Sequence, residues 1–255
     1  MSGVADLPAA LLRAERRGLA LAPLDGGLEP GKADGYRLQR LLLQRRLAGG
    51  EALRGWKVAL CGAAAQARFG LDEPVYGALT SAMELPVDER IGLGRFIQPK
   101  LEIELAYRLA RGLAPGRYDD QQLLRAIAEV APAFEVADCR WRGWRFGLGA
   151  FLADNAAAAG YCLGAFQAFD AHRHAQVTYR LTRDGAGLGA GCAGCEPMGH
   201  LLWLLRRLLD DGQPLHAGQV VLSGALLAPL DIVAGDYSLE MLGQRLLVSF
   251  VAPAA

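Results

Sequence analysis

The stretch PKLEIELAYRL, residues 99–109, decides the fold, because apolar and polar side chains alternate along it with a period of two residues. In a β-strand this alternation places Leu101 and Ile103 on one face and Glu102 and Glu104 on the other. We therefore expect a strand with one face in the core and one face available for chemistry.

Two carboxylates on one strand face repel each other unless a cation lies between them. Residues two apart on a strand are separated by roughly 6.5–7 Å at the backbone. Like charges brought to ~4 Å repel by about 4 kcal/mol at an effective dielectric constant of 20. A divalent ion between Glu102 and Glu104 would remove that penalty. The alternative is a solvated strand face on which Arg108 acts as a partial counterion.

The composition indicates a globular chain, and the net charge favours a small-molecule ligand. Its 255 residues suffice for one large domain or two small ones, and 52% of them are hydrophobic while 21% are charged. The net charge is zero, from 27 basic and 27 acidic residues, which provides no basic surface for nucleic acid or an anionic membrane. We expect a small-molecule ligand and neither of those partners.

The sequence predicts a cytoplasmic location. No apolar run approaches the ~18 residues of a membrane span, and Arg13, Arg16 and Arg17 occupy the region where a secretory signal needs an apolar stretch. The five cysteines are odd in number and scattered, which is typical of reduced thiols.

Lysine is rare, since 24 of the 27 basic residues are arginine. The three lysines are Lys32, Lys57 and Lys100. An ammonium group is a compact point charge whose pKa responds to burial, which suits carboxylate pairing and proton transfer in a tight site. We expect this of Lys57 and Lys100, whereas Lys32 lies in a loop rich in glycine and proline.

The periodicity of the chain changes at about residue 54. Apolar positions three and four apart predict helices over about 7–17 and 33–48. Short strand-like runs follow, with helical stretches near 119–130 and 197–210. We therefore divide the chain into a helical N-terminal region, 1–53, and a catalytic region, 54–255. The predicted strands are WKVAL, PKLEIELAYRL, APAFEVADCR, QVTYRLTRD, QVVLSGAL and QRLLVSFVA.

A third carboxylate, Glu135, lies in the strand-like run APAFEVADCR. If its strand neighbours the one that carries Glu102 and Glu104, three oxygen donors converge. Such hard ligands suit Mg²⁺ or Mn²⁺, which usually keep several positions for water or substrate. An anionic substrate would then need another cation nearby, and Lys57 is the natural candidate.

Six segments in order along most of the chain resemble a known family. They are GWKVAL, LDEPVYGALTSAM, PKLEIELAY, PAFEVADCRW, LADNAAAAGYCLG and VLSGALLAPLDIVAGD. They are similar to the 2-oxopent-4-enoate hydratase and 4-oxalocrotonate decarboxylase family, within the fumarylacetoacetate hydrolase superfamily.

The resemblance implies an α/β (α+β) fold with a mixed β-roll core and a helical N-terminal cover. It implies a homo-oligomer, and association of such an enzyme with a homologous hydratase is a further expectation. The family's G-x-K motif places its active-site lysine on Lys57, and its E-x-E motif with a later Glu places Mg²⁺ or Mn²⁺ on Glu102, Glu104 and Glu135. The positions matched to substrate binding are Asp72, Val75, Leu79, Ala157 and Ser223.

Two reactions fit the resemblance. The first is decarboxylation of an unsaturated 2-oxo dicarboxylic acid such as 2-oxohex-3-enedioate (4-oxalocrotonate) through a metal-bound dienolate, and the second is hydration of 2-oxopent-4-enoate. We favour decarboxylation, because Val75 stands where the compared hydratases carry Asp, and the run RWRGWRFGL is closer to the decarboxylases. An apolar residue cannot activate water, and an apolar pocket favours loss of a carboxylate as CO2.

The chain also departs from the family pattern. Ala157 replaces a serine, Cys139 replaces the serine of D-S-R, and Ala59 replaces a glycine. These losses of hydroxyl groups predict either a less polar 2-oxo acid or a chain that binds without turnover, as a partner subunit. We expect Asp72 and Asp154 to serve either as polar site residues or in turns, and Arg140 to pair with Asp138 or a metal-binding Glu.

Hydrolysis of a carbon–carbon bond, as in the acylpyruvate hydrolases, is disfavoured. Those enzymes are expected to use an early His, and the first histidine of this chain is His172.

Overall fold

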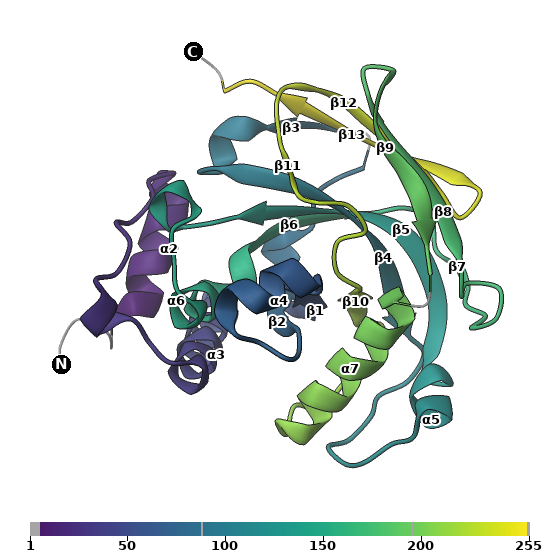
Figure 1. Cartoon of the computed structure of the whole chain (residues 1–255), viewed down its shortest axis with the longest axis horizontal. Helices are drawn as coiled ribbons and strands as arrows, with labels where there is room; N and C mark the ends of the chain where they lie inside the picture. Colours follow the sequence, from purple (N-terminus) through teal and green to yellow (C-terminus); the bar gives the residue numbers. More distant parts are fainter. Residues whose placement is uncertain (1–5, 88, 195, 254–255) are drawn as a thin grey trace.

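The computed structural model describes residues 6–87, 89–194 and 196–253, and places them in two mixed sheets flanked by helices. Figure 1 shows α2 (Leu7–Arg17), α3 (Lys32–Ala48) and α6 (Leu148–Ala153) together at the left of the sheets, with α7 (Glu196–Asp210) at the lower centre. The described helices are α2 (Leu7–Arg17), α3 (Lys32–Ala48), α4 (Ala63–Phe69), α5 (Asp120–Leu124), α6 (Leu148–Ala153) and α7 (Glu196–Asp210).

The larger sheet holds the strands of the predicted site. Its neighbouring strands, in order, are β2 (Val75–Thr80), β1 (Leu53–Ala59), β10 (Val220–Leu222), β4 (Pro99–Leu109), β5 (Ile127–Asp138) and β6 (Ala158–Leu163). Two short strands join this sheet, since β11 (Leu230–Asp231) pairs with β4 and β7 (Gln167–Ala168) pairs with β5. The β1–β10 pair is parallel, and the other pairs are antiparallel.

The smaller sheet closes over one face of the larger one. Its strands, in order, are β3 (Arg90–Gly92), β13 (Gln244–Val251), β12 (Gly235–Met241), β8 (Val177–Arg183) and β9 (Ala186–Ala193). Leu101, Ile103 and Leu105 of β4 belong to the same buried cluster as Leu239 and Phe250 of this sheet. The odd-numbered face of β4 is therefore core, as its alternation predicted, and the mixed β-roll with a helical cover is confirmed.

The N-terminal helices follow their sequence signals. α2 buries Leu7, Leu11 and Ala14, and Gly18 ends it in the left-handed region with a φ of 62°. Because that conformation strains any residue with a Cβ, glycine suits this position. The described helices are within one residue of the predicted 7–17 and 33–48, while the division at residue 53 stays a prediction.

The helix expected over 119–130 is wrong in its second half. α5 ends at Leu124, and β5 begins at Ile127, which pairs with Leu109 of β4. The long β4 offers backbone partners along its whole length, so cross-strand hydrogen bonds override the local helical pattern.

Candidate metal centre and cavity

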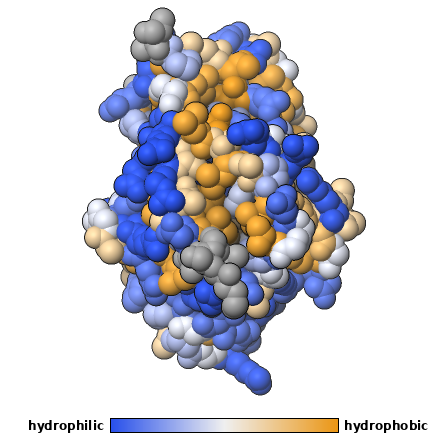
Figure 2. Space-filling view, turned by 90° about the vertical axis from the view of Figure 1, so that its left-hand side faces the viewer, coloured by the Kyte–Doolittle hydropathy of each residue, from blue (hydrophilic) through white to orange (hydrophobic). Residues whose placement is uncertain are grey.

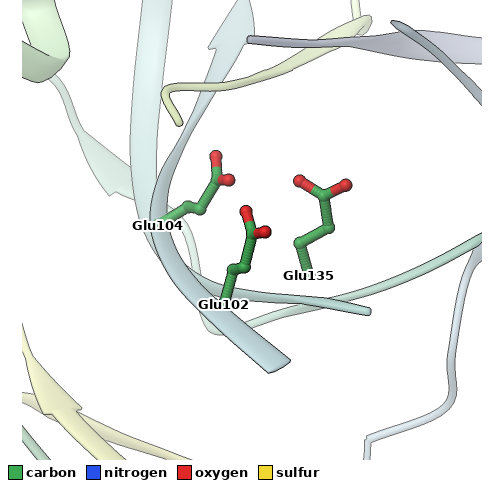
Figure 3. A group of neighbouring side chains, drawn as sticks. All are labelled: Glu102, Glu104 and Glu135. Carbon is green, nitrogen blue, oxygen red and sulfur yellow. The ribbon is translucent and has the colours of Figure 1, made fainter. Parts of the chain in front are cut away.

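Neighbouring strands bring the three predicted carboxylates together. Glu102 and Glu104 lie on the same face of β4, and antiparallel pairing sets Glu135 of β5 directly opposite Glu102. Each of the three residues offers a carboxylate oxygen within 4.8 Å of the others. Figure 3 shows the carboxylates pointing into one shared space.

This cluster is buried and short of hydrogen bonds. Glu104 and Glu135 are fully buried, while Glu102 is partly exposed. Glu104 Oε2 accepts a hydrogen bond from the Gly224 amide at 2.6 Å. Among the described residues, none donates a hydrogen bond to Glu104 Oε1 or Glu135 Oε2. Buried carboxylate oxygens without donors are costly, and a bound cation would satisfy them.

Lys57 supplies one positive charge to the cluster. Its side chain is 2% exposed, and its Nζ lies 2.8 Å from Glu135 Oε1. Lys57 belongs to β1, and β10 lies between β1 and β4, so the ammonium reaches the carboxylates across an intervening strand. With all four groups ionised, the cluster carries two net negative charges, which one divalent cation balances.

The pKa values reflect this crowding. Burial, followed by the charge of Glu135, raises the pKa of Glu102 to about 7 and that of Glu104 well above its usual range. Burial lowers the pKa of Lys57, but the three carboxylates outweigh it and the pKa lies above its ordinary value. The lysine is thus held as an ammonium.

The alternative of a solvated strand face does not hold. Arg108 pairs with Glu129 at 2.8 Å, and the carboxylate of Glu104 is fully buried. No arginine counterion is therefore available to this cluster from β4.

A cavity of about 690 Å³ opens beside the cluster. Lys57 and Glu102 line it, and most other lining side chains are apolar. Ala157, which replaces the family's serine, lies in its wall beside Ala156. Of the five predicted substrate-binding residues, Ala157 is the one among its lining residues.

The structure places the other four predicted residues elsewhere. Val75 and Leu79 are buried in β2, and Asp72 is exposed in the turn before β2. Ser223 is buried, and its hydroxyl accepts a hydrogen bond from the Leu105 amide at 3.2 Å. None of the four lines the cavity, and their contact with substrate stays a prediction.

Arg140 pairs with neither Asp138 nor a cluster carboxylate through its side chain. Its Nε lies 2.5 Å from Asp154 Oδ1, and its remaining nitrogens donate to the carbonyls of Asp138, Asp154 and Ala158. Asp138 instead accepts from the amides of Ile97 and Gln98. The expectation for Arg140 was wrong, because the chain turns back through α6 and brings Asp154 beside Arg140.

A left-handed turn follows Asp154. Asn155, Ala156 and Ala157 have φ values of 54°, 51° and 59°. Such a conformation costs a residue with a Cβ roughly 1–2 kcal/mol, so neighbouring contacts must hold it. The Asn155 side chain does so by accepting from the Ala78 amide and donating to the Ala78 carbonyl, each at 2.8 Å.

An aromatic wall was missed by the sequence analysis. The Phe146 ring stacks on Phe151 at 4.9 Å between centroids and on Phe69 at 6.0 Å, and all three side chains line the cavity with Trp144. Trp144 and Phe146 belong to the run RWRGWRFGL, whose aromatic content was the available signal.

The mixed β-roll fold is shared with solved enzyme structures that are described with bound metal ions. By backbone, the chain is similar to the 4-oxalocrotonate decarboxylase of Pseudomonas putida G7, described as complexed with magnesium and adipate. The TM-score is 0.89 at 22% identity, over 97% of each chain. It is also similar to the fumarylpyruvate hydrolase of Pseudomonas aeruginosa, described in complex with Mn²⁺ and pyruvate, with a TM-score of 0.58 at 15% identity over 78% of this chain and 89% of that one.

Curated relatives are closer in sequence. The chain is 34% identical to a 2-keto-4-pentenoate hydratase of Burkholderia vietnamiensis, over 95% of each protein. It is also 34% identical to the TodF product hydratase of Pseudomonas putida, over 89% of this chain and 86% of that protein. No family model matches the chain. At this level of identity the chain belongs to the family of the 2-keto-4-pentenoate hydratases.

Among the described residues, no helix has both the length and the apolar character required to span a bilayer.

Proposed function

We propose that this protein is a metal-dependent lyase that hydrates an unsaturated 2-oxo acid of the 2-keto-4-pentenoate type. The observation that carries the proposal is the buried group of three carboxylates with unused oxygens, beside Lys57 and open to a cavity on one side. The names of the curated relatives support hydration.

Glu102, Glu104 and Glu135 would hold the metal, and their hard oxygen donors suit Mg²⁺ or Mn²⁺. Structural neighbours contain magnesium or manganese, which supports a divalent ion. A metal ion here would polarise the carboxylate and oxo oxygens of a 2-oxo acid. The partly exposed Glu102 faces the cavity, so the acid's head would enter from that side.

Lys57 is the residue proposed to handle protons. Converting the dienol 2-hydroxypenta-2,4-dienoate to 4-hydroxy-2-oxopentanoate first moves the enol proton to C5, which gives a conjugated 2-oxo-3-enoate. Addition of water then puts a proton on C3, beside the oxo group, and a hydroxyl on C4. The Lys57 ammonium lines the cavity and is held in place by Glu135, so its Nζ is a proton donor within reach of the bound head.

Hydration replaces the decarboxylation favoured by the sequence. That preference rested on Val75 and on the run RWRGWRFGL, but the Val75 side chain is fully buried in β2 and does not line the cavity. Its apolar character therefore argues against neither reaction. Decarboxylation is the second candidate, because the apolar lining of the cavity favours departure of neutral CO2.

The two reactions are separated by supplying both substrates with Mg²⁺. We expect 2-hydroxypenta-2,4-dienoate to be converted to 4-hydroxy-2-oxopentanoate, followed by loss of dienol absorbance and by NMR. Release of CO2 from 2-oxohex-3-enedioate at a higher kcat/KM would favour the decarboxylase. No turnover of either acid, together with tight binding to a homologous hydratase, would favour a non-catalytic partner subunit.

Self-association is proposed on separate grounds. Figure 2 shows a band of hydrophobic side chains between hydrophilic ones on the face that carries the N-terminal helices. Leu19 and Leu28, in the segment between α2 and α3, are 65% and 56% exposed. A homo-oligomer would cover such side chains, and light scattering on the purified protein would measure its mass.

A further inference from the structure

The cavity is larger than the acid that the proposed function requires. With roughly 30 Å³ for each non-hydrogen atom, the share of a water molecule in the liquid, a five-carbon 2-oxo acid fills on the order of 240 Å³. The cavity measures about 690 Å³. An acid of this size, held near Lys57 and Glu102, leaves more than half of this space unfilled.

The remaining space has apolar walls. Phe69, Phe146 and Phe151 stack with interplanar angles of 10° and 17°, which gathers three aromatic rings along one wall. Ala65 of α4 and Leu227 also line the cavity. Apolar walls of this kind gain free energy by burying an apolar group and none by leaving the space to water.

The two cations on this side are already engaged. Lys100 Nζ lies 2.5 Å from Asp231 Oδ1 and 5.6 Å from the Trp144 ring centroid. The Arg68 guanidinium lies over the rings of Phe69 and Phe146, at 5.0 and 5.7 Å from their centroids. A second carboxylate on the substrate would have to compete with these contacts, whereas an apolar group would extend the stacked surface.

We propose that the outer part of this cavity binds an apolar, ring-sized substituent, so that the protein acts on a monocarboxylic 2-oxo acid longer than 2-keto-4-pentenoate. This inference rests on the proposed function, because the metal-binding end of the site must hold the acid's head. It specifies the substrate's far end, which the family resemblance does not.

Binding of unreactive saturated acids tests the inference without requiring turnover. Calorimetry in Mg²⁺ would compare 2-oxopentanoate, 2-oxo-5-phenylpentanoate and 2-oxohexanedioate. We expect the phenyl acid to bind at least tenfold more tightly than either of the others. Equal binding of the phenyl and short acids, or tighter binding of the dicarboxylate, would overturn the inference alone. Absence of binding by all three would overturn the proposed function as well.

Two variants of α4 locate the effect. Ala65 lines the cavity, whereas Ala67, in the same helix, is exposed and does not. Ala65→Phe should reduce the affinity ratio between the phenyl and short acids to about one, while Ala67→Phe should retain it. A ratio unchanged in Ala65→Phe, with a thermal melt like that of the parent, would contradict the assigned location. The measurement on the parent protein stands if a variant fails to fold.

Discussion

The buried ion pairs Arg140–Asp154 and Lys57–Glu135 differ in how fully their polar atoms are used. Around Arg140, the guanidinium contacts one carboxylate and three carbonyl oxygens, and Asp154 Oδ2 also accepts from the Arg140 amide at 2.9 Å. Around Lys57, two further carboxylates crowd the pair, and among the described donors none reaches Glu135 Oε2.

This difference distinguishes an ion pair that stabilises the fold from a cluster that can bind a ligand. A buried ion pair whose hydrogen bonds are complete stabilises the fold and has no free polar atom with which to bind a ligand. A buried cluster with spare oxygens and excess negative charge is unstable by itself and is completed by a cation. The spare oxygens therefore distinguish the candidate functional pair better than burial does.

The largest effect is expected from Glu104→Gln. Because this change removes a charged member of the proposed metal site, turnover should fall by about 10³-fold or more, equivalent to ~4 kcal/mol, while the fold persists. Kinetics at saturating Mg²⁺ and calorimetric metal titration would measure it. Glu129→Gln is the matched control, since Glu129 pairs with Arg108 outside the cluster. Parent-like turnover in Glu104→Gln would remove the metal assignment.

Breaking the saturated pair should affect stability. Arg140→Met leaves Asp154 buried without its cation, and such a change costs about 3–5 kcal/mol of unfolding free energy. Urea denaturation would measure this, and Arg140→Met combined with Asp154→Leu should recover part of it. A loss below about 1 kcal/mol would show that this pair does not hold the scaffold.

Lys57→Met should impair catalysis without weakening the metal site. If Lys57 is the proton donor, as proposed, its loss is expected to lower kcat by about 10²-fold. Mg²⁺ affinity should stay equal or rise, because the competing ammonium is gone from Glu135. Lys32→Met is the control, since Lys32 pairs with Glu73 in a partly exposed ion pair. A clear fall in Mg²⁺ affinity in Lys57→Met would contradict this division of roles.

The smallest effect concerns pH and metal removal. Burial raises the pKa of Glu102 to about 7 and also raises that of Glu104. The folded, metal-free protein is therefore more stable relative to the unfolded chain when these groups are protonated. The contribution of these groups to its stability should be fully present below about pH 4.5 and be lost as pH rises through 7. Mg²⁺ should then raise the Tm more at pH 8 than at pH 5.5, by a few °C, since about 1 kcal/mol shifts the Tm of a chain this size by 2–4 °C. Thermal melts with EDTA or Mg²⁺ would reveal it, and equal shifts at the two pH values would contradict it.

Much of the metal centre could be predicted, because β-strand alternation is a local property. The period of two in residues 99–109 placed Glu102 and Glu104 on one face, and the structure agrees. The position of Glu135 opposite Glu102 needed strand pairing, which the family resemblance supplied and local periodicity could not.

The cavity walls could not be predicted, because they are assembled from distant segments. Phe69 of α4 meets Phe146 from a loop almost eighty positions later, and no local pattern encodes that contact. Val75 and Arg140 illustrate the same limit. The alignment position of Val75 did not reveal its burial away from the cavity, and the partner of Arg140 was set by a return of the chain through α6.

The left-handed turn at Asn155–Ala157 has a consequence for engineering. Its backbone is held by the Asn155 side chain against β2, so position 157 contributes little to keeping the turn in shape. Ala157→Ser therefore adds one oxygen atom to the cavity lining and leaves the backbone of the turn unchanged. Position 157 is therefore a place where directed evolution could alter selectivity between apolar and polar acids by single atoms.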